Sequence, residues 1–116
     1  MNKKYKKYID YIVKDIELPY LKYLEQYGLS TDEYELIMSK VYNQPVTIKG
    51  DYVYNTNGNQ IYYENSYGDW FKVEYNTNGN KIYFENSNGD WVKYEYDTNG
   101  NKIYYENSDG YIEDRR

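Results

Sequence analysis

Hydrophobic residues near the start of the chain recur every three or four positions, the spacing that places them on one side of an α-helix. They are Tyr5, Tyr8, Ile9, Ile12, Val13 and Ile16, and the opposite side carries Lys3, Lys6, Lys7, Lys14 and Asp15. Pro19 is well placed to begin a second helix, and Gly28 is a plausible end for it. The first 28 residues therefore predict two amphipathic helices.

A third helix is predicted from residue 31 to about Tyr42. Ser30 and Glu33 have the spacing of a capping box, in which each side chain bonds the backbone N–H of the other residue. The expected buried side consists of Tyr34, Leu36, Ile37 and Val41. Pro45 restricts the backbone of Gln44 and should end the helix before it.

Beyond residue 46 the pattern changes to alternating positions separated by turns, and it repeats. The hexapeptide Tyr54–Asn59 recurs with little change at Tyr75–Asn80 and Tyr96–Asn101, 21 residues apart. A second glycine turn, at Gly68, Gly89 and Gly110, has the same period. Repeats of this length indicate one supersecondary unit stacked on copies of itself, and such arrays usually present a binding surface.

The turns also predict a strand register. A two-residue type I′ turn at Asn78-Gly79, the commonest use of Asn-Gly in hairpins, would oppose Tyr75 to Ile82, Val73 to Phe84 and Lys72 to Glu85. At the alternate turn, a three-residue loop with Gly89 left-handed would oppose Phe84 to Val92. Both arrangements bring hydrophobic residues together on one face.

We therefore predict an α+β fold, with N-terminal helices packed on an antiparallel meander of six or seven strands. Residues 1–45 would form the helical segment and 46–116 the three-hairpin sheet, within one compact domain. Val46 and Ile48 should lengthen the first strand. The face expected to contact the helices carries Tyr52, Tyr54, Ile61, Tyr63, Phe71, Val73, Tyr75, Ile82, Phe84, Val92, Tyr94, Tyr96, Ile103 and Tyr105.

The other face of the predicted sheet holds large rings among alternating charges. Such rows can simply stabilise a single-layer sheet through cross-strand pairs. Tyr and Trp are also the residues most often used as binding anchors, because they bury a large area at little entropic cost. The partner-binding residues predicted on this basis are Trp70, Trp91, Tyr62, Tyr83, Tyr104, Glu74, Glu85, Glu95 and Glu106.

Composition argues against most catalytic chemistry. The chain has no Cys and no His, which removes thiol nucleophiles, imidazole bases and the usual zinc ligands. The segment Asp97–Asn101 has some features of a calcium loop, but the equivalent Asn55 and Asn76 are not acidic. We expect a protein that is not an enzyme and uses no cofactor and no metal. Its 20 tyrosines supply a core rich in rings.

Charge separates the two halves of the chain. Residues 1–50 contain eight Lys and seven acidic residues, whereas residues 51–116 contain six Lys or Arg and twelve acidic residues. The second half is thus a poor direct ligand for nucleic acid. It could imitate one and bind a protein with a basic nucleic-acid-binding groove, or the acidity could serve solubility alone. Charged residues interrupt the first helix, so we expect no membrane span and a cytoplasmic protein.

Three resemblances bear on function. The motif Tyr96-Asp97-x-x-Gly100-Asn101 resembles the YD repeats of RHS-type proteins. Gly68-Asp69-Trp70 and Gly89-Asp90-Trp91 are similar to choline-binding and cell-wall-binding repeats, which implies a carbohydrate-binding alternative. By size and acidity alone the chain resembles phage anti-defence proteins such as anti-CRISPRs, which implies an inhibitor in the host cytoplasm. A further alternative is an adaptor that forms a homo-oligomer through a sheet edge.

Overall fold

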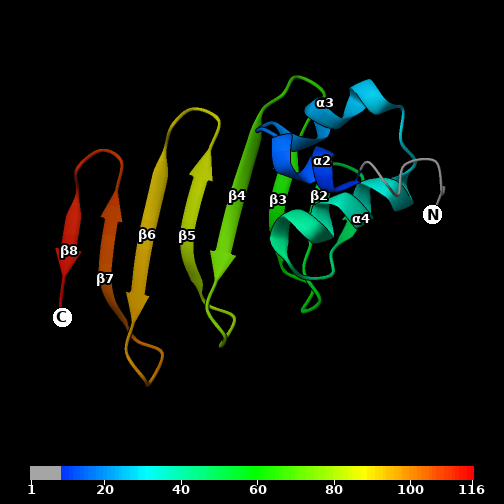
Figure 1. Cartoon of the computed structure of the whole chain (residues 1–116). Coiled ribbons are helices and arrows are strands. Elements are labelled where there is room, and N and C mark those ends of the chain that lie inside the picture. The colour runs from blue at the N-terminus through cyan, green and yellow to red at the C-terminus, as the bar shows by residue number, and fades with distance from the viewer. Residues whose placement is uncertain (1–8) are drawn as a thin grey trace. The chain divides into compact units, whose positions relative to one another are not determined.

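The computed structural model describes residues 9–116 (Figure 1). These residues form two compact units, with the boundary between Gly68 and Asp69. Part of the first predicted helix, including Tyr5, Tyr8 and the lysines before them, lies outside the described residues. Within residues 9–116, none of the helices has the length and apolar character needed to cross a membrane.

Unit 1 contains three described α-helices and one short 3-10 helix. They are α2 (Ile9–Asp15), α3 (Tyr20–Leu24), η1 (Glu25–Tyr27) and α4 (Thr31–Tyr42). Helix α3 follows Pro19, and η1 ends at Gly28, whose φ of 60° is left-handed. The predicted start at Pro19 and stop at Gly28 are confirmed, but the segment between them is a short α-helix followed by a 3-10 helix.

Helix α4 has the predicted capping box. Glu33 N–H donates to Ser30 Oγ at 3.3 Å, and Ser30 N–H donates to Glu33 Oε1 at 3.1 Å. The helix ends at Asn43, which adopts a left-handed φ of 55°, so it stops before the proline that was expected to end it. Asparagine tolerates this conformation better than most residues. Ile37 and Met38 are the buried hydrophobic residues of α4.

Three antiparallel strands complete unit 1: β1 (Thr47–Lys49), β2 (Tyr52–Tyr54) and β3 (Gln60–Glu64). The prediction that Val46 and Ile48 lengthen the first strand is wrong. A left-handed Gly50 turns the chain, so β1 is a separate strand in which Ile48 lies opposite Val53. Ile48 therefore shares the face of Val53 and lies on the opposite face from Tyr52.

The helices cover the face of unit 1 that was predicted to be exposed. Val53 and Tyr62 are fully buried and Glu64 is buried as well. The ring of Tyr20 in α3 lies 5.1 Å from the ring of Tyr62, centre to centre. On the face expected to contact the helices, Tyr52 is 37% exposed, although Ile61 is buried. The predicted packing face is thus wrong for unit 1, because the polar ends of Tyr62 and Glu64 find partners in α3.

Unit 2 contains strands and turns and no helix of its own (Figure 1). Its antiparallel meander consists of β4 (Trp70–Tyr75), β5 (Lys81–Asn86), β6 (Trp91–Tyr96), β7 (Lys102–Asn107) and β8 (Ile112–Asp114). The described residues thus contain eight strands in two units, where six or seven were predicted. The additional strands are the short β1 and β8.

The predicted register of unit 2 is largely confirmed. Val73 lies opposite Phe84, which in turn lies opposite Val92. Lys72 lies opposite Glu85, as predicted. The pairing of Tyr75 with Ile82 is wrong, because the register shifts between Glu74 and Tyr75 and places Tyr75 opposite Lys81. This bulge follows from the turn that joins the two strands.

The Asn-Gly turns are not type I′ turns. In the turn after β4, Gly79 has a φ of 85°, but Asn78 does not have the positive φ that a type I′ turn requires. The side-chain oxygen of Asn76 accepts the N–H groups of Asn78 and Asn80 at 3.0 and 2.9 Å, and Asn76 N–H donates to the Asn80 carbonyl. The result is a three-residue loop closed by an asparagine side chain.

The alternate turn is built in the same way. Asn86 accepts the N–H groups of Asn88 and Asp90 through its side-chain oxygen, and Gly89 has a φ of 86°. The predicted three-residue loop is confirmed here. Apart from the turn at Gly50, the turns between strands share the sequence Asx-Ser/Thr-x-Gly, beginning at Asn55, Asn65, Asn76, Asn86, Asp97 and Asn107. The Tyr96-Asp97 motif is one of these hairpin turns.

Replacing Gly79 with alanine should destabilise the chain through the backbone alone. No other group lies within 4 Å of the position that the new Cβ would take. We expect the free energy of unfolding to fall by about 1–2 kcal/mol, the cost of a left-handed conformation for an L-residue. Urea unfolding measures this. Asn78→Ala, one residue earlier, should be nearly neutral, and an equal loss in both variants would contradict the loop geometry.

Candidate functional site

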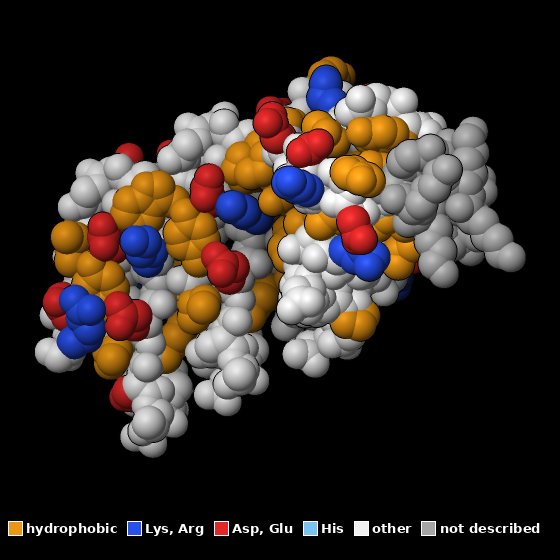
Figure 2. All heavy atoms as spheres, in the orientation of Figure 1, with side chains coloured by type: hydrophobic (Ala, Val, Ile, Leu, Met, Phe, Trp, Pro, Cys, Tyr) orange, Lys and Arg blue, Asp and Glu red, His pale blue; other side chains and the backbone are white. Residues whose placement is uncertain are grey.

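One face of unit 2 carries most of the predicted partner-binding residues, and we call it the aromatic-acidic face. Residues that lie opposite each other on neighbouring strands share a face, and the pairs Lys72–Glu85, Glu85–Trp91 and Lys93–Glu106 define this one. In Figure 2, hydrophobic side chains on these strands are interleaved with acidic and basic ones. The face consists of Trp70, Lys72, Glu74, Tyr83, Glu85, Trp91, Lys93, Glu95, Tyr104 and Glu106.

The structure separates one predicted site residue from the others. Tyr62 belongs to unit 1 and is fully buried beneath α3, so it cannot contact a partner as the folded chain stands. This corrects the prediction that Tyr62 continues an exposed row of tyrosines. Within unit 2, Tyr83 and Tyr104 do not face each other either, because Lys93 lies opposite Tyr83 and Glu95 lies opposite Tyr104. The two rings are therefore separated by charged side chains and do not form a continuous ladder.

Each tyrosine on the aromatic-acidic face is bonded to a glutamate two residues further along its own strand. The hydroxyl of Tyr83 donates to Glu85 Oε1 at 2.9 Å, and that of Tyr104 donates to Glu106 Oε1 at 2.6 Å. Alternation along a strand puts both members of a pair on one face. All four side chains are half-buried. Each pair is therefore a fixed unit of one ring and one carboxylate.

The tryptophans are held in place by serines from turns. The backbone N–H of Trp70 donates to Ser87 Oγ at 3.1 Å, and the backbone N–H of Ser87 donates back to the Trp70 carbonyl at 2.9 Å. Trp91 makes the same two bonds with Ser108. The ammonium of Lys93 lies 5.2 Å from the ring centre of Trp91, within range of a cation–π interaction. Both indoles are half-buried.

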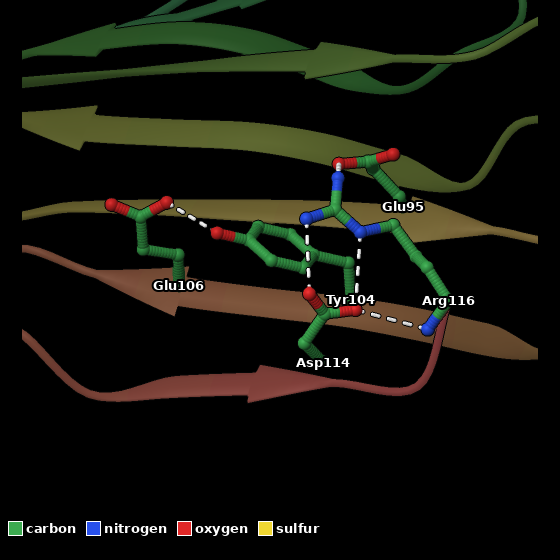
Figure 3. A network of polar contacts seen from close by, with 5 residues as sticks. All are labelled: Glu95, Tyr104, Glu106, Asp114 and Arg116. Atoms are coloured by element: carbon green, nitrogen blue, oxygen red, sulfur yellow. Dashed lines mark hydrogen bonds and ion pairs between the residues drawn. The ribbon is translucent and has the colours of Figure 1, made fainter.

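A polar network surrounds Tyr104 (Figure 3). The Arg116 guanidinium lies 4.1 Å from the centre of the Tyr104 ring, and it contacts Glu95 at 3.2 Å and Asp114 at 3.1 Å. Hydrogen bonds from Arg116 hold the pKa of Asp114 below its usual value. Asp114 and Arg116 were not predicted as site residues. One signal was present, since Asp114 reverses the charge of Lys93, which lies 21 residues earlier.

Tyr67 is a second residue that the sequence did not predict as part of a site. It is 85% exposed, more than any aromatic residue on the aromatic-acidic face, and it belongs to the turn that ends unit 1. Its position in the turn is Asn or Asp in the five other turns of this kind. That departure from the repeat was the available signal.

The electrostatics of the aromatic-acidic face favour hydrogen-bond donors and cations as ligands. Glu85 forms one ion pair, a long contact of 3.7 Å with Lys72. Burial and the hydrogen bond to Glu85 raise the pKa of Tyr83 to about 12, so its hydroxyl keeps its proton at a pH where an ordinary tyrosine ionises. The hydrogen bond to Glu106 raises the pKa of Tyr104 too. Across residues 9–116 there is no cluster of three acidic side chains arranged to hold a metal ion.

The raised pKa of Tyr83 predicts a pH effect of definite sign. The folded chain holds this proton more tightly than the unfolded chain, whose tyrosine pKa is 10.0. The resulting stabilisation is fully present below pH 10 and is lost as the pH rises toward about 12. NMR titration of chains labelled at the tyrosine ring carbon measures the pKa of Tyr83, with Tyr83→Phe giving the assignment. In Glu85→Gln the pKa should move back toward 10, and an unchanged value would contradict the pairing.

Comparison with protein-family models gives no match, and comparison with curated proteins gives none either.

Proposed function

We propose that the chain is a non-catalytic protein-binding protein whose aromatic-acidic face contacts a partner through a basic surface. One observation supports this most directly: Glu74, Glu85, Glu95 and Glu106 share a face with half-buried Tyr and Trp rings. Rings provide desolvated anchors, and carboxylates provide electrostatic attraction and orientation. A face that combines both suits a partner rich in Lys and Arg.

The most concrete form of the proposal is an inhibitor, of the anti-CRISPR kind in its mode of action, that blocks a nucleic-acid-handling enzyme. Unit 2 has ten acidic residues and six basic ones, so it repels nucleic acid and attracts the basic groove that binds it. In this form Glu85 and Glu95 take the place of phosphates. The rings of Trp70, Trp91 and Tyr83 provide the apolar contacts with the partner. The setting would be the cytoplasm of a host cell.

Affinity capture from a nuclease-treated lysate tests the proposal. The full-length tagged chain should capture a nucleic-acid-binding enzyme, and the variant Glu85→Lys/Glu95→Lys should lose it. The purified complex should weaken steeply with salt, because charges at an exposed surface are screened over about 8 Å at physiological ionic strength.

A matched control keeps the charge change and alters its place. Asp109→Lys/Glu113→Lys changes the net charge equally, but Asp109 lies in a turn and Glu113 lies opposite Tyr105 on the other face. This control should still capture the partner. Capture that survives the reversal at Glu85 and Glu95 would overturn the proposal. If the parent chain bound sugar and only Trp70→Ala/Trp91→Ala lost its ligand, a carbohydrate-binding module would be favoured instead.

A further inference from the structure

On three strands a tyrosine hydroxyl donates to the glutamate two residues further along, and the first of these Tyr-x-Glu pairs shows what such a pair can bind. In unit 1 the Tyr62 hydroxyl donates to Glu64 Oε1 at 2.8 Å, as in the other two copies. This pair receives three consecutive backbone N–H groups from the start of α3. Tyr20 N–H donates to the Tyr62 hydroxyl at 3.0 Å, and the N–H groups of Leu21 and Lys22 donate to the two Glu64 oxygens at 2.7 and 2.6 Å.

Ring contact completes this recognition. The Tyr20 ring packs against the Tyr62 ring at 5.1 Å, with the planes tilted by 39°. The pair therefore recognises an aromatic residue together with its own N–H group and the next two. These N–H groups lie in the first turn of α3, where backbone donors have no partner within the helix. Residues 20–22 are thus a ligand supplied by the chain itself.

The second copy has the same internal geometry without that ligand. Tyr83 and Glu85 are two residues apart on one strand and are joined by the same hydroxyl-to-carboxylate bond. Both are half-buried, and within residues 9–116 no backbone N–H group donates to either side chain. A carboxylate offers about four acceptor positions, so Glu85 retains capacity beyond Tyr83 and its long contact with Lys72.

The third copy is already partly occupied. The Arg116 guanidinium lies over the Tyr104 ring and is held there by Glu95 and Asp114. A partner's ring would have to displace this guanidinium. At the second copy Lys93 lies opposite Tyr83, but its ammonium lies over the Trp91 ring. The second copy is therefore the accessible one.

We propose that Tyr83 and Glu85 form a docking subsite for the start of a helix in the partner protein. The docked segment begins with an aromatic residue, and the backbone N–H groups of that residue and of the next two have no partner within the helix. The partner's ring packs on Tyr83, its first N–H bonds the Tyr83 hydroxyl, and the following two bond Glu85. This inference rests on the proposed function. It adds directional hydrogen bonds from uncharged backbone N–H groups to the charge attraction between the two proteins.

The test uses the full chain and an N-acetylated synthetic peptide with the sequence of residues 17–28. The peptide contains Glu17, Lys22 and Glu25, so it carries a net negative charge and cannot bind an acidic face by charge attraction. Titration is followed by NMR of the labelled tyrosine rings. We expect saturable shifts of the Tyr83 signal, with an apparent affinity that falls at least tenfold in Glu85→Gln. The affinity should be unchanged in Glu113→Gln, because Glu113 lies opposite Tyr105 on the other face.

A second peptide isolates the backbone donors. N-methylation at Leu21 and Lys22 removes the two N–H groups and keeps every side chain, and it should abolish the shifts of Tyr83. Shifts confined to Tyr62, shifts of Tyr83 that persist with the methylated peptide, or no shift at millimolar peptide would each overturn the inference. The outcome is separate from the capture experiment, because an enzyme captured through charge with no peptide binding would leave the proposed function standing and remove the subsite.

Discussion

Replacing Tyr62 with alanine should lower the free energy of unfolding of unit 1 by about 3–5 kcal/mol, the usual loss when a fully buried aromatic side chain is truncated. Tyr62 is the largest of the fully buried residues in the described chain. The substitution removes its ring contact with Tyr20 and the acceptor for the Tyr20 N–H. It also leaves Glu64 with one partner fewer. The loss should exceed that of any truncation on the aromatic-acidic face, where no side chain is fully buried.

The repeat supplies the matched control for this prediction. Tyr83 occupies the equivalent place in the next repeat but is only half-buried, so Tyr83→Ala should cost about 1 kcal/mol or less, the scale of a cross-strand pair. The two units have separate signals. The described helices all lie in unit 1, so helical circular dichroism reports its unfolding in urea, while both tryptophans lie in unit 2 and report it by fluorescence.

Tyr62→Ala should therefore shift the helical transition and leave the tryptophan transition in place. If both tyrosine variants lost the same free energy, or if Tyr62→Ala moved only the tryptophan signal, the burial of Tyr62 beneath α3 would be contradicted.

The local features of the fold could be predicted from sequence because each depends on few residues close together in the chain. Ser30 and Glu33 form a cap whatever the rest of the chain does, and Gly89 marks a left-handed turn that sets the pairing of Phe84 with Val92. The turn type at Asn78 was missed because Asn-Gly alone does not reveal the bonds made by the side chain of Asn76.

The face of unit 1 that the helices cover could not be predicted, because the residues that decide it are almost identical from one repeat to the next. Tyr62 and Glu64 have the same spacing as Tyr83 and Glu85, yet the first pair is buried and the second is half-exposed. The difference comes from residues about 40 positions away, at the start of α3. Tyrosine is suited to either outcome, since its ring is apolar and its hydroxyl is polar.

The candidate site was predicted in outline by the same alternation that defines a strand face. Glu74, Glu85 and Glu95 lie where the pattern put them, beside the rings. Arg116 was missed because it lies beyond the last full repeat, where no earlier copy suggests that it folds back onto Tyr104 (Figure 3).

Glu64→Gln should lower the free energy of unfolding of unit 1 by about 2–3 kcal/mol, the range for hydrogen bonds to a charged group in a buried place. The carboxylate accepts the N–H groups of Leu21 and Lys22 on separate oxygens. Glutamine offers one oxygen, and its NH₂ group would face the second donor. Glu85→Gln, at the equivalent position in the next repeat, should cost about 1 kcal/mol or less, as expected for a partly exposed ion pair.

Amide hydrogen exchange locates the effect. In Glu64→Gln the amides of Leu21 and Lys22 should exchange faster than in the parent chain, and in Glu85→Gln they should not change. Unchanged exchange at both amides in Glu64→Gln would show that the carboxylate does not hold the start of α3. The expected contrast also bears on function, because the same pair that stabilises the fold in unit 1 is left free to accept backbone donors from a partner at Tyr83 and Glu85.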